Sequence, residues 1–284
     1  MTRILYGKPV ADKIKAHMIE QINAFKSESI FPKIAIIRVG QRPDDIAYEE
    51  RIIKNCNDLG IEVSTHRVDH NIFMDNLEKL MLDLNAADDI HGILMFRPLP
   101  PHLDADLICR TIDPTKDIDC MSPVNAQKIF IGDRSVIPPC TPLAVLEILK
   151  YYDYSLEGAD VVIVNRSMVL GKPLGMLLLD ENATVTICHS RTKDIKSLTS
   201  HADIIVTGAG KAGFFDSSYF SSHSVVIDAG INFKNGDICG DVEHGAVLDF
   251  VEAVSPVPGG VGTVTSTILL RNVLVAIELQ KKSR

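Results

Sequence analysis

The 284-residue sequence lacks several features that would assign it to a class of protein at once. Its apolar runs are only a few residues long, so we expect no transmembrane span. The segment MTRILYGKPVADKIK at the start holds no apolar core of the kind that directs secretion. Acidic residues outnumber basic ones by 37 to 29, a formal net charge of −8. This balance argues against nucleic acid or an anionic membrane surface as the main partner.

Disulfide and metal-binding patterns are also missing. The 6 cysteines form no C-x-x-C pair, and the 9 histidines show no H-E-x-x-H or comparable spacing. We therefore expect reduced, buried thiols in a cytoplasmic protein, and no metal site. Apolar residues make up 46% of the chain and charged residues 23%, which is typical of a soluble protein with a substantial core.

Helical and strand-like segments alternate through the first half of the chain. Apolar residues recur every three or four positions over residues 8–26, which predicts an amphipathic helix. Buried strands are expected at 33–39, 61–68 and 92–96, with helices at about 44–59 and around 77–84 between them. This order predicts a mostly parallel sheet that is covered on both faces.

A proline-rich seam at residues 137–142 separates the two halves. We expect Thr141 to cap a helix that has Pro142 at its first position and ends near Tyr152. Beyond it we expect strands at 160–164, 183–188, 203–206 and 225–228, helices at 171–179 and 263–280, and a hairpin over 233–242 around Asn235-Gly236. The prediction is an α/β protein with two α/β domains flanking a cleft, residues 1–140 and 141–284, the second of them Rossmann-like.

The turn between the strand at 160–164 and the next helix is a candidate nucleotide site. It lacks G-x-G-x-x-G, but Asn165, Ser167 and Gly171 are residue types that tolerate a close approach of backbone to a diphosphate. The helix that follows would offer free N–H groups to the anion. An ordinary structural turn explains the pattern equally well.

Two arginines favour NADP over NAD as the cofactor. The strand at 183–188 is followed by Ser190 and Arg191, close to the position at which an NAD-preferring fold places an acidic residue. Together with Arg166 in the preceding turn, these side chains suit a 2′-phosphate. The alternative is a solvated loop with surface arginines.

A series of motifs, in order along the chain, resembles one enzyme family. They are Asp117-Ile-Asp119, Pro139-Cys-Thr-Pro142, Arg166-Ser167…Gly171-Lys-Pro173, Cys188-His-Ser190, Ala202-Asp-Ile204, Val226-Ile-Asp-Ala-Gly-Ile-Asn232, Gly240-Asp-Val242 and Pro256-Val-Pro-Gly-Gly-Val-Gly262. From end to end the chain resembles the methylenetetrahydrofolate dehydrogenase/methenyltetrahydrofolate cyclohydrolase family. The resemblance implies a homodimer in which the final helix packs back on the first domain. It also implies hydride transfer from 5,10-methylenetetrahydrofolate to NADP, followed by hydrolysis of the methenyl product.

The resemblance implies functional residues as well. Asp119 would accept hydrogen bonds from the pterin and Tyr48 would stack on it, although a loop-capping aspartate and a half-buried core tyrosine are the structural alternatives. The substrate would also meet a glycine-rich loop made of Pro258, Gly259, Gly260, Val261 and Gly262, with Thr265 beyond it capping the last helix. The cofactor would be bound by Asn165, Arg166, Ser167, Gly171, Ser190, Arg191, Thr207, Gly208 and Ile231.

Two positions depart from the family pattern. Ile52 stands where the family's Tyr-x-x-x-Lys motif has its lysine, and Phe96 replaces the glutamine of Gln-Leu-Pro-Leu-Pro. Lys54 lies about 240° round the helix from Tyr48, and Arg51, on roughly the right face, stays protonated and is a poor proton acceptor. Hydride transfer needs no general base, whereas hydrolysis gains about 10²–10⁴ in rate from one. Cyclohydrolase activity is therefore doubtful.

Three hypotheses follow from these residues. The first is an NADP-dependent methylenetetrahydrofolate dehydrogenase with weak or absent cyclohydrolase activity. The second is a fully bifunctional enzyme in which Arg51, Arg97 or a water molecule substitutes for the lysine. The third is a non-catalytic homologue that binds folate or nucleotide.

Overall fold

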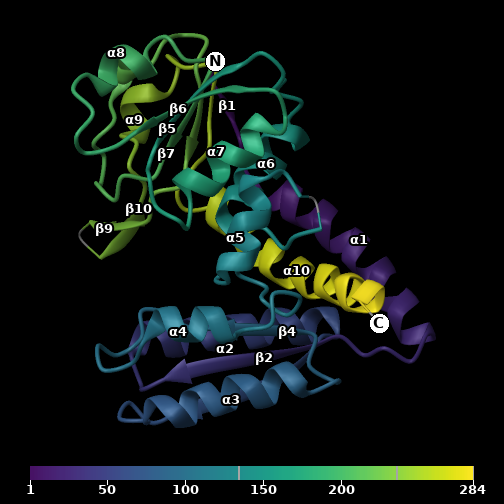
Figure 1. Cartoon of the computed structure of the whole chain (residues 1–284). Helices are drawn as coiled ribbons and strands as arrows, with labels where there is room; N and C mark the ends of the chain where they lie inside the picture. The colour runs from purple at the N-terminus through teal and green to yellow at the C-terminus, as the bar shows by residue number, and fades with distance from the viewer. Residues whose placement is uncertain (134, 235, 284) are drawn as a thin grey trace. The chain divides into compact units, whose positions relative to one another are not determined.

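The computed structural model describes residues 1–133, 135–234 and 236–283, and the chain folds into two compact units (Figure 1). Unit 1 contains Met1–Lys13 and Pro139–Ile268; unit 2 contains Ile14–Pro138 and the chain from Leu269 onward. Each unit is therefore built from two separate stretches of sequence. Both have parallel α/β architecture, which confirms the predicted fold class.

A three-stranded parallel sheet in the order β3-β2-β4 lies at the centre of unit 2. Its strands are β2 (Lys33–Val39), β3 (Glu62–Val68) and β4 (Gly92–Met95). The crossover helices are α2 (Pro43–Leu59) and α3 (Met74–Ala86), close to their predicted positions. A parallel bridge between Ile93 and Asp117 lies next to β4 and brings the segment around Asp119 alongside the sheet.

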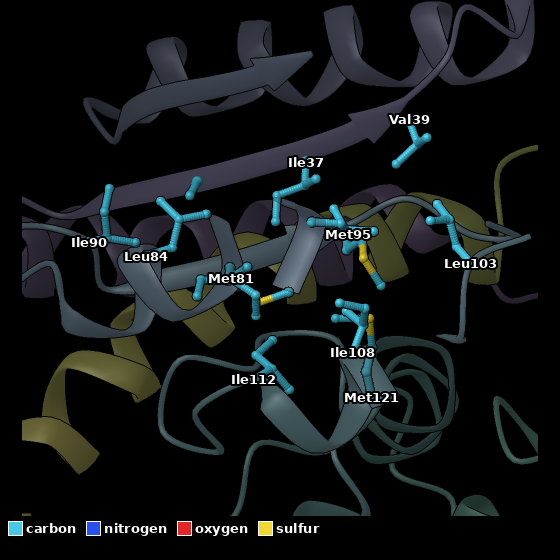
Figure 2. Close-up of a cluster of buried hydrophobic side chains, with 13 residues drawn as sticks. Ile37, Val39, Met81, Leu84, Ile90, Met95, Leu103, Ile108, Ile112 and Met121 are labelled. Carbon is cyan, nitrogen blue, oxygen red and sulfur yellow. The ribbon is translucent and has the colours of Figure 1, made fainter. Parts of the chain in front are cut away.

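The core of unit 2 fills the space between its sheet and its helices. Figure 2 shows Ile37 and Met95 from the sheet pointing toward Met81 of α3 and toward Ile108 and Met121. Two short helices that the sequence patterns did not predict, α4 (Ala105–Thr111) and α5 (Pro123–Phe130), follow β4. Burial of this apolar surface, at roughly 25 cal/mol per Å², holds the carboxyl ends of the strands in place.

Unit 1 contains a six-stranded parallel sheet in the order β1-β11-β8-β7-β5-β6. The strands are β1 (Arg3–Ile4), β5 (Asp160–Val164), β6 (Thr184–Cys188), β7 (Ile204–Thr207), β8 (Val225–Asp228) and β11 (Ala253–Val254). The helical elements of this unit are α6 (Cys140–Tyr151), α7 (Gly171–Leu179), α8 (Ile195–Thr199), the 3-10 turn η1 (Ser217–Tyr219) and α9 (His244–Val247). Because β6 and β7 lie on opposite sides of β5, the winding of the sheet reverses there, as in Rossmann-type folds.

Several predicted boundaries need correction. The helix α6 begins at Cys140 with Pro139 at its cap position, so Thr141 is a helical residue and not the cap. Likewise α10 (Val261–Ser283) begins before Thr265, whose hydroxyl donates to the Val261 carbonyl at 3.0 Å from within the helix. The predicted hairpin is formed by β9 (Asn232–Lys234) and β10 (Asp237–Cys239), while Asn235 lies outside the described residues.

Two long helices contribute residues to both units. They are α1 (Gly7–Ser27) and α10. Among the described residues, one helix is long and apolar enough to cross a membrane, α10 over Val261–Lys282. However, 61% of its most apolar window is buried within the fold, as is usual for a core helix.

The cysteines all lie in the described part of the chain and are free, but the expectation that they are buried holds for only three of them. Three of them are buried (Cys56, Cys140 and Cys188), whereas Cys109, Cys120 and Cys239 are partly exposed. Burial raises the pKa of Cys56 to about 12, so its thiol stays protonated at neutral pH. Within the described ranges, no group of three or more His, Cys, Asp or Glu side chains has the placement of a metal site.

Candidate functional site

Four side chains of the candidate site lie at the carboxyl ends of the strands of unit 2. Phe96 and Arg97 directly follow β4, and the Phe96 N–H donates to the Ile37 carbonyl of β2 at 3.0 Å. Asp119 comes from the segment that runs beside β4, and Tyr48 from the second turn of α2, which follows β2. In parallel α/β sheets this edge is the usual place for a ligand.

Two aromatic rings form the apolar part of this region. The Tyr48 and Phe96 ring centroids lie 5.3 Å apart with an interplanar angle of 36°. The Phe96 side chain is buried, while Tyr48 is half-buried and presents part of its ring. The Arg51 guanidinium carbon lies 5.8 Å from the Tyr48 ring centroid, within the range of a cation–π contact.

The charged part of the region is a pair of opposite charges. Arg97 Nη2 lies 3.5 Å from Asp119 Oδ2, and the two side chains are 34% and 31% exposed. Sequence reasoning named Asp119 as a binding residue but treated Arg97 only as a substitute for the missing lysine. Their proximity requires the placement of the Asp119 segment beside β4, which no local motif reveals.

Buried Asp117 organises the loop that carries Asp119. Its Oδ1 accepts from the Met121 N–H at 2.9 Å, and its Oδ2 accepts from the Ser122 N–H at 2.7 Å and from Asn125 Nδ2 at 3.0 Å. Burial raises the pKa of Asp117, an effect that these donors oppose. The loop around Asp119 is therefore held by buried hydrogen bonds.

A buried ionic cluster holds α2 against the sheet. Glu49, next to Tyr48, accepts from Arg38 Nε at 2.6 Å and from Arg67 Nε at 2.7 Å. Arg38 of β2 and Arg67 of β3 are direct neighbours in the strand register, and Arg38 also donates to the Gly40 carbonyl. Sequence analysis missed this cluster because it depends on strand pairing. We infer that Glu49 fixes the position of Tyr48.

The positions of the missing lysine and glutamine are apolar and closed to water. Ile52 is 3% exposed and Phe96 is 7% exposed. Lys54 points to solvent, with its side chain 75% exposed and its Nζ 2.9 Å from Asp58 Oδ2. Lys54 therefore does not replace the lysine, as its helical spacing predicted.

In unit 1, Asn165 organises the turn between β5 and α7. Its Oδ1 accepts from the Ser167 N–H at 2.8 Å and the Gly171 N–H at 3.0 Å, while its Nδ2 donates to the Gly208 carbonyl at 2.6 Å. A Cβ on Gly171 would lie 1.9 Å from the Asn165 carbonyl oxygen, so only glycine is accommodated there. The turn thus links the loops after β5 and β7, on the two sides of the reversal in winding.

The expectation of free N–H groups at the start of α7 is wrong. The Gly171 N–H donates to Asn165, and the Lys172 N–H donates to the Ser167 carbonyl at 3.1 Å. Pro173 carries no N–H, and the Leu174 N–H donates to the Leu170 carbonyl at 2.9 Å. These amides are already used within the protein, by the Asn165 side chain at Gly171 and by backbone carbonyls at Lys172 and Leu174.

Arg166, Ser190 and Arg191 are exposed and follow two adjacent strands. Val164 and Cys188, the last residues of β5 and β6, are paired in the sheet. The turns that carry the three side chains therefore leave the same edge of the sheet. Two guanidinium groups and a hydroxyl at this edge are donors suited to a phosphate ester.

Two aspartates accept hydrogen bonds from the segment that carries two of the remaining predicted cofactor residues, Thr207 and Gly208. Thr207 is buried and its hydroxyl donates to Asp228 Oδ1 at 3.1 Å, so its side chain is turned into the protein. Asp241 accepts from the N–H groups of Ala209, Gly210 and Lys211, and this fixes the backbone beyond Gly208. Ile231 is exposed. Burial raises the pKa of Asp228, opposed by three backbone donors.

The glycine-rich loop is shorter than predicted. It ends at Gly260, and Val261 is the first residue of α10 and is buried. Gly259 has a φ of 104°, a left-handed conformation that favours glycine. Its carbonyl accepts from the Gly7 N–H at 2.8 Å, and Pro258 and Gly259 are the exposed part of the loop.

The fold and these sites define an α/β protein with a Rossmann-like nucleotide-binding unit. Two family models match the chain: the tetrahydrofolate dehydrogenase/cyclohydrolase catalytic domain over residues 5–119, and the NAD(P)-binding domain of the same family over residues 139–281. The protein belongs to the tetrahydrofolate dehydrogenase/cyclohydrolase family.

Similar proteins cover the whole chain. "Bifunctional protein FolD 1" of Desulfitobacterium hafniense (strain Y51) is 49% identical over 281 residues, 99% of this chain and 100% of the relative. The structure of the FolD enzyme of Campylobacter jejuni matches with a TM-score of 0.96 and 37% identity, covering 99% of this chain and 100% of that one. The Trypanosoma brucei enzyme, solved with NADP and an inhibitor, matches with a TM-score of 0.91 and 31% identity over 100% of this chain and 99% of that one.

Proposed function

We propose that this protein is an NADP-dependent 5,10-methylenetetrahydrofolate dehydrogenase with little or no methenyltetrahydrofolate cyclohydrolase activity. The observation that carries the proposal is the apolar surface beside Tyr48. Ile52 and Phe96, 3% and 7% exposed, occupy the positions of the family's lysine and glutamine. The family identity of the whole chain supports the dehydrogenase activity.

Unit 2 would bind the folate. Asp119 accepts hydrogen bonds from the N–H donors of the pterin, and the half-buried Tyr48 ring stacks on it. Ile52 and Phe96 keep water away from the same face. A hydride leaves the one-carbon bridge without the help of a base, whereas addition of water to the methenyl product requires removal of a proton. The apolar pair therefore affects the second step far more than the first.

Unit 1 would bind the nucleotide, and its exposed donors fit NADP. Arg166, Ser190 and Arg191 would hold the 2′-phosphate, while Asn165 and Gly171 shape the adjoining turn. Three further residues would lie along the cofactor: Thr207, through its backbone, Gly208 and Ile231. Ser167 would contact the cofactor from the turn. When bound, NADP supplies the hydride acceptor. The NADP complex of the related T. brucei enzyme supports this choice.

The remaining assignments extend this proposal. We assign the folate-binding role to unit 2, which contains most of the domain predicted at residues 1–140, and the NADP-binding role to unit 1, which contains most of the domain predicted at residues 141–284. The exposed part of the glycine-rich loop, Pro258 and Gly259, would contact substrate, and Gly260 and Val261 would support it. We further propose a cytoplasmic homodimer.

A fully bifunctional enzyme is the second candidate. Arg51 lies beside the Tyr48 ring and Arg97 beside Asp119, so each guanidinium is close to the proposed folate residues. A relative that is 49% identical carries the name "Bifunctional protein FolD 1". An arginine would have to orient water rather than accept its proton, because it stays protonated.

One assay distinguishes these functions. Purified protein is given methylenetetrahydrofolate with NADP or with NAD, and methenyltetrahydrofolate alone, while absorbance follows formation and loss of the methenyl product against an enzyme-free control. Reduction of NADP with accumulation of methenyltetrahydrofolate supports the proposal. Loss of the methenyl compound well above the enzyme-free rate supports the bifunctional enzyme. Ligand binding without turnover would identify a non-catalytic homologue and contradict both.

A further inference from the structure

Arg97 and Asp119 form a guanidinium–carboxylate pair at the carboxyl edge of the unit 2 sheet. Their closest atoms, Nη2 and Oδ2, are 3.5 Å apart, and about a third of each side chain is exposed. A partly exposed pair of this length contributes little to stability. The exposed parts of both side chains can be reached by a small molecule.

The backbone under the pair is fixed on both sides. The Ile93 N–H donates to the Lys116 carbonyl at 2.7 Å, which ties the Asp119 segment to β4. The buried Asp117 carboxylate holds the chain just beyond it through Met121 and Ser122. Arg97 follows β4 directly. The sheet and the bridge beside it thus place the donor and the acceptor next to each other.

We propose that Arg97 and Asp119 together recognise the 2-amino-4-oxo edge of the pterin, and that Arg97 selects the 4-oxo group. This inference rests on the proposed function. The edge presents two neighbouring N–H donors, on the 2-amino nitrogen and N3, followed by one acceptor, the oxygen at C4. The carboxylate of Asp119 meets the two donors, and the adjacent guanidinium of Arg97 meets the acceptor.

The guanidinium makes this recognition selective because it can only donate hydrogen bonds and cannot accept them. Arginine remains protonated and has donors but no acceptor. A 4-amino group in place of the oxygen would direct an N–H at the guanidinium and leave donors of both partners unsatisfied, and the same replacement removes the N3–H that faces Asp119. A polar group left unpaired in this way costs more than the mean value of a hydrogen bond, and such sites discriminate strongly between analogues.

The test compares two probes: folic acid, which has the 4-oxo group and an N3–H, and aminopterin, its 4-amino analogue, in which N3 carries no hydrogen. Dissociation constants are measured by calorimetry for the wild type, R97L, R97K and the control R110L, which removes an exposed arginine of α4. We expect the wild type and R110L to prefer folic acid by about tenfold or more. In R97L the ratio should fall by about threefold or more from the wild-type value, while Asp119 keeps the preference that comes from N3–H, and R97K should retain more of the preference than R97L.

Each outcome decides one question. Equal affinities for both probes in the wild type, or an unchanged ratio in R97L that still binds both, would overturn the role of Arg97 and leave the dehydrogenase proposal standing. If the folded wild type bound neither probe nor tetrahydrofolate and reduced no NADP, the proposed function itself would fail. Far-ultraviolet circular dichroism of each variant shows whether it is folded.

Discussion

At the residue scale, positive charge near Tyr48 comes from arginine, and the lysine typical of the family is missing. Ile52, four residues after Tyr48 on α2, is buried, and Phe96 packs against the Tyr48 ring at 5.3 Å between centroids. An arginine contributes a fixed charge and directed donors, but it does not exchange protons near neutral pH. The side chains of this region therefore suit binding and orientation better than proton transfer.

Restoring the two polar groups should raise hydrolysis. We expect the double variant Ile52→Lys with Phe96→Gln to increase the rate of methenyltetrahydrofolate hydrolysis by about 10²-fold, because general acid–base help contributes about 10²–10⁴. Dehydrogenase activity should change much less. Lys54→Ala, which alters an exposed lysine of the same helix, is the matched control. No gain in a folded double variant would mean that the missing pair does not limit hydrolysis.

Cofactor choice is also a property of single residues. Because Arg166 and Arg191 lie at one edge of the unit 1 sheet, replacing either with alanine should raise the KM for NADP by about tenfold or more, as expected for loss of a charge-assisted contact. The KM for NAD, which lacks the 2′-phosphate, should stay within about twofold. Steady-state kinetics with both cofactors check this. Parallel increases for NADP and NAD would place the arginines elsewhere on the cofactor.

At the scale of elements, α2 depends on one buried carboxylate. Burial alone would raise the pKa of Glu49, but hydrogen bonds from Arg38 and Arg67 outweigh it and hold the pKa below its ordinary value. Glu49→Gln leaves Arg38 buried without its charge partner. We expect a loss of about 2–4 kcal/mol in the free energy of unfolding at pH 7, and a lower kcat through displacement of Tyr48. Glu50→Gln, the exposed neighbour on α2, is the control.

The effect of Glu49 on stability should depend on pH. A carboxyl group with a lowered pKa in the folded state stabilises fully above its unfolded pKa of about 4.3, and this contribution is lost as the pH falls through the folded pKa. The difference between wild type and Glu49→Gln should therefore be constant from pH 6 to 7 and shrink below about pH 4.3. Denaturant unfolding across this range measures it. A difference that did not change with pH would contradict an ionised Glu49.

Elements with a strong local pattern were predictable, and those defined by distant partners were not. The run KIAIIRV predicted β2 with its observed bounds, Lys33–Val39. In contrast, β1 and β11 are two residues long and pair Arg3 with Ala253, a contact that has no local signal. The short helix α4 depends on its cap, where Asp104 Oδ1 accepts from the Leu107 N–H at 2.9 Å. Short helices have little stability of their own, so periodicity does not reveal them.

The same distinction holds for the candidate site. The sequence motifs predicted Tyr48 and Asp119 as site residues, because their residue types and order are typical of the family. The Glu49 cluster and the Arg97–Asp119 pair depend on strand register and on a bridge between Ile93 and Asp117. Helix spacing correctly placed Lys54 away from Tyr48. It gave no indication that the Asn165 side chain accepts from the Gly171 N–H at the start of α7.

At the scale of the whole molecule, each unit combines distant parts of the chain. Within unit 2, Asn272 of α10 donates through Nδ2 to the Ile118 carbonyl at 2.9 Å and to the Pro138 carbonyl at 3.2 Å. Gln280, further along α10, donates to the His91 and Thr115 carbonyls at 2.8 and 3.1 Å. These side-chain amides donate hydrogen bonds to loop carbonyls that are not paired in the sheet ladders.

Removing the first of these amides should weaken unit 2. We expect Asn272→Ala to lower the free energy of unfolding by about 1–3 kcal/mol, because buried carbonyls lose their donor. Asn76→Ala, at an exposed position of α3, should change it by less than about 0.5 kcal/mol. Thermal and urea unfolding test both variants. Equal stability of Asn272→Ala and wild type would contradict the role given to α10.

Because each unit combines two separate stretches of the chain, the two units can complete their folding at different stages of synthesis. A ribosome that has just translated residue 138 has made most of unit 2 but not the stretch from Leu269 onward that belongs to the same unit. All of unit 1 is available once residue 268 has left the exit tunnel, so unit 1 can finish first although most of it is encoded later. Unit 2 can complete its fold only after the stretch from Leu269 onward has emerged as well.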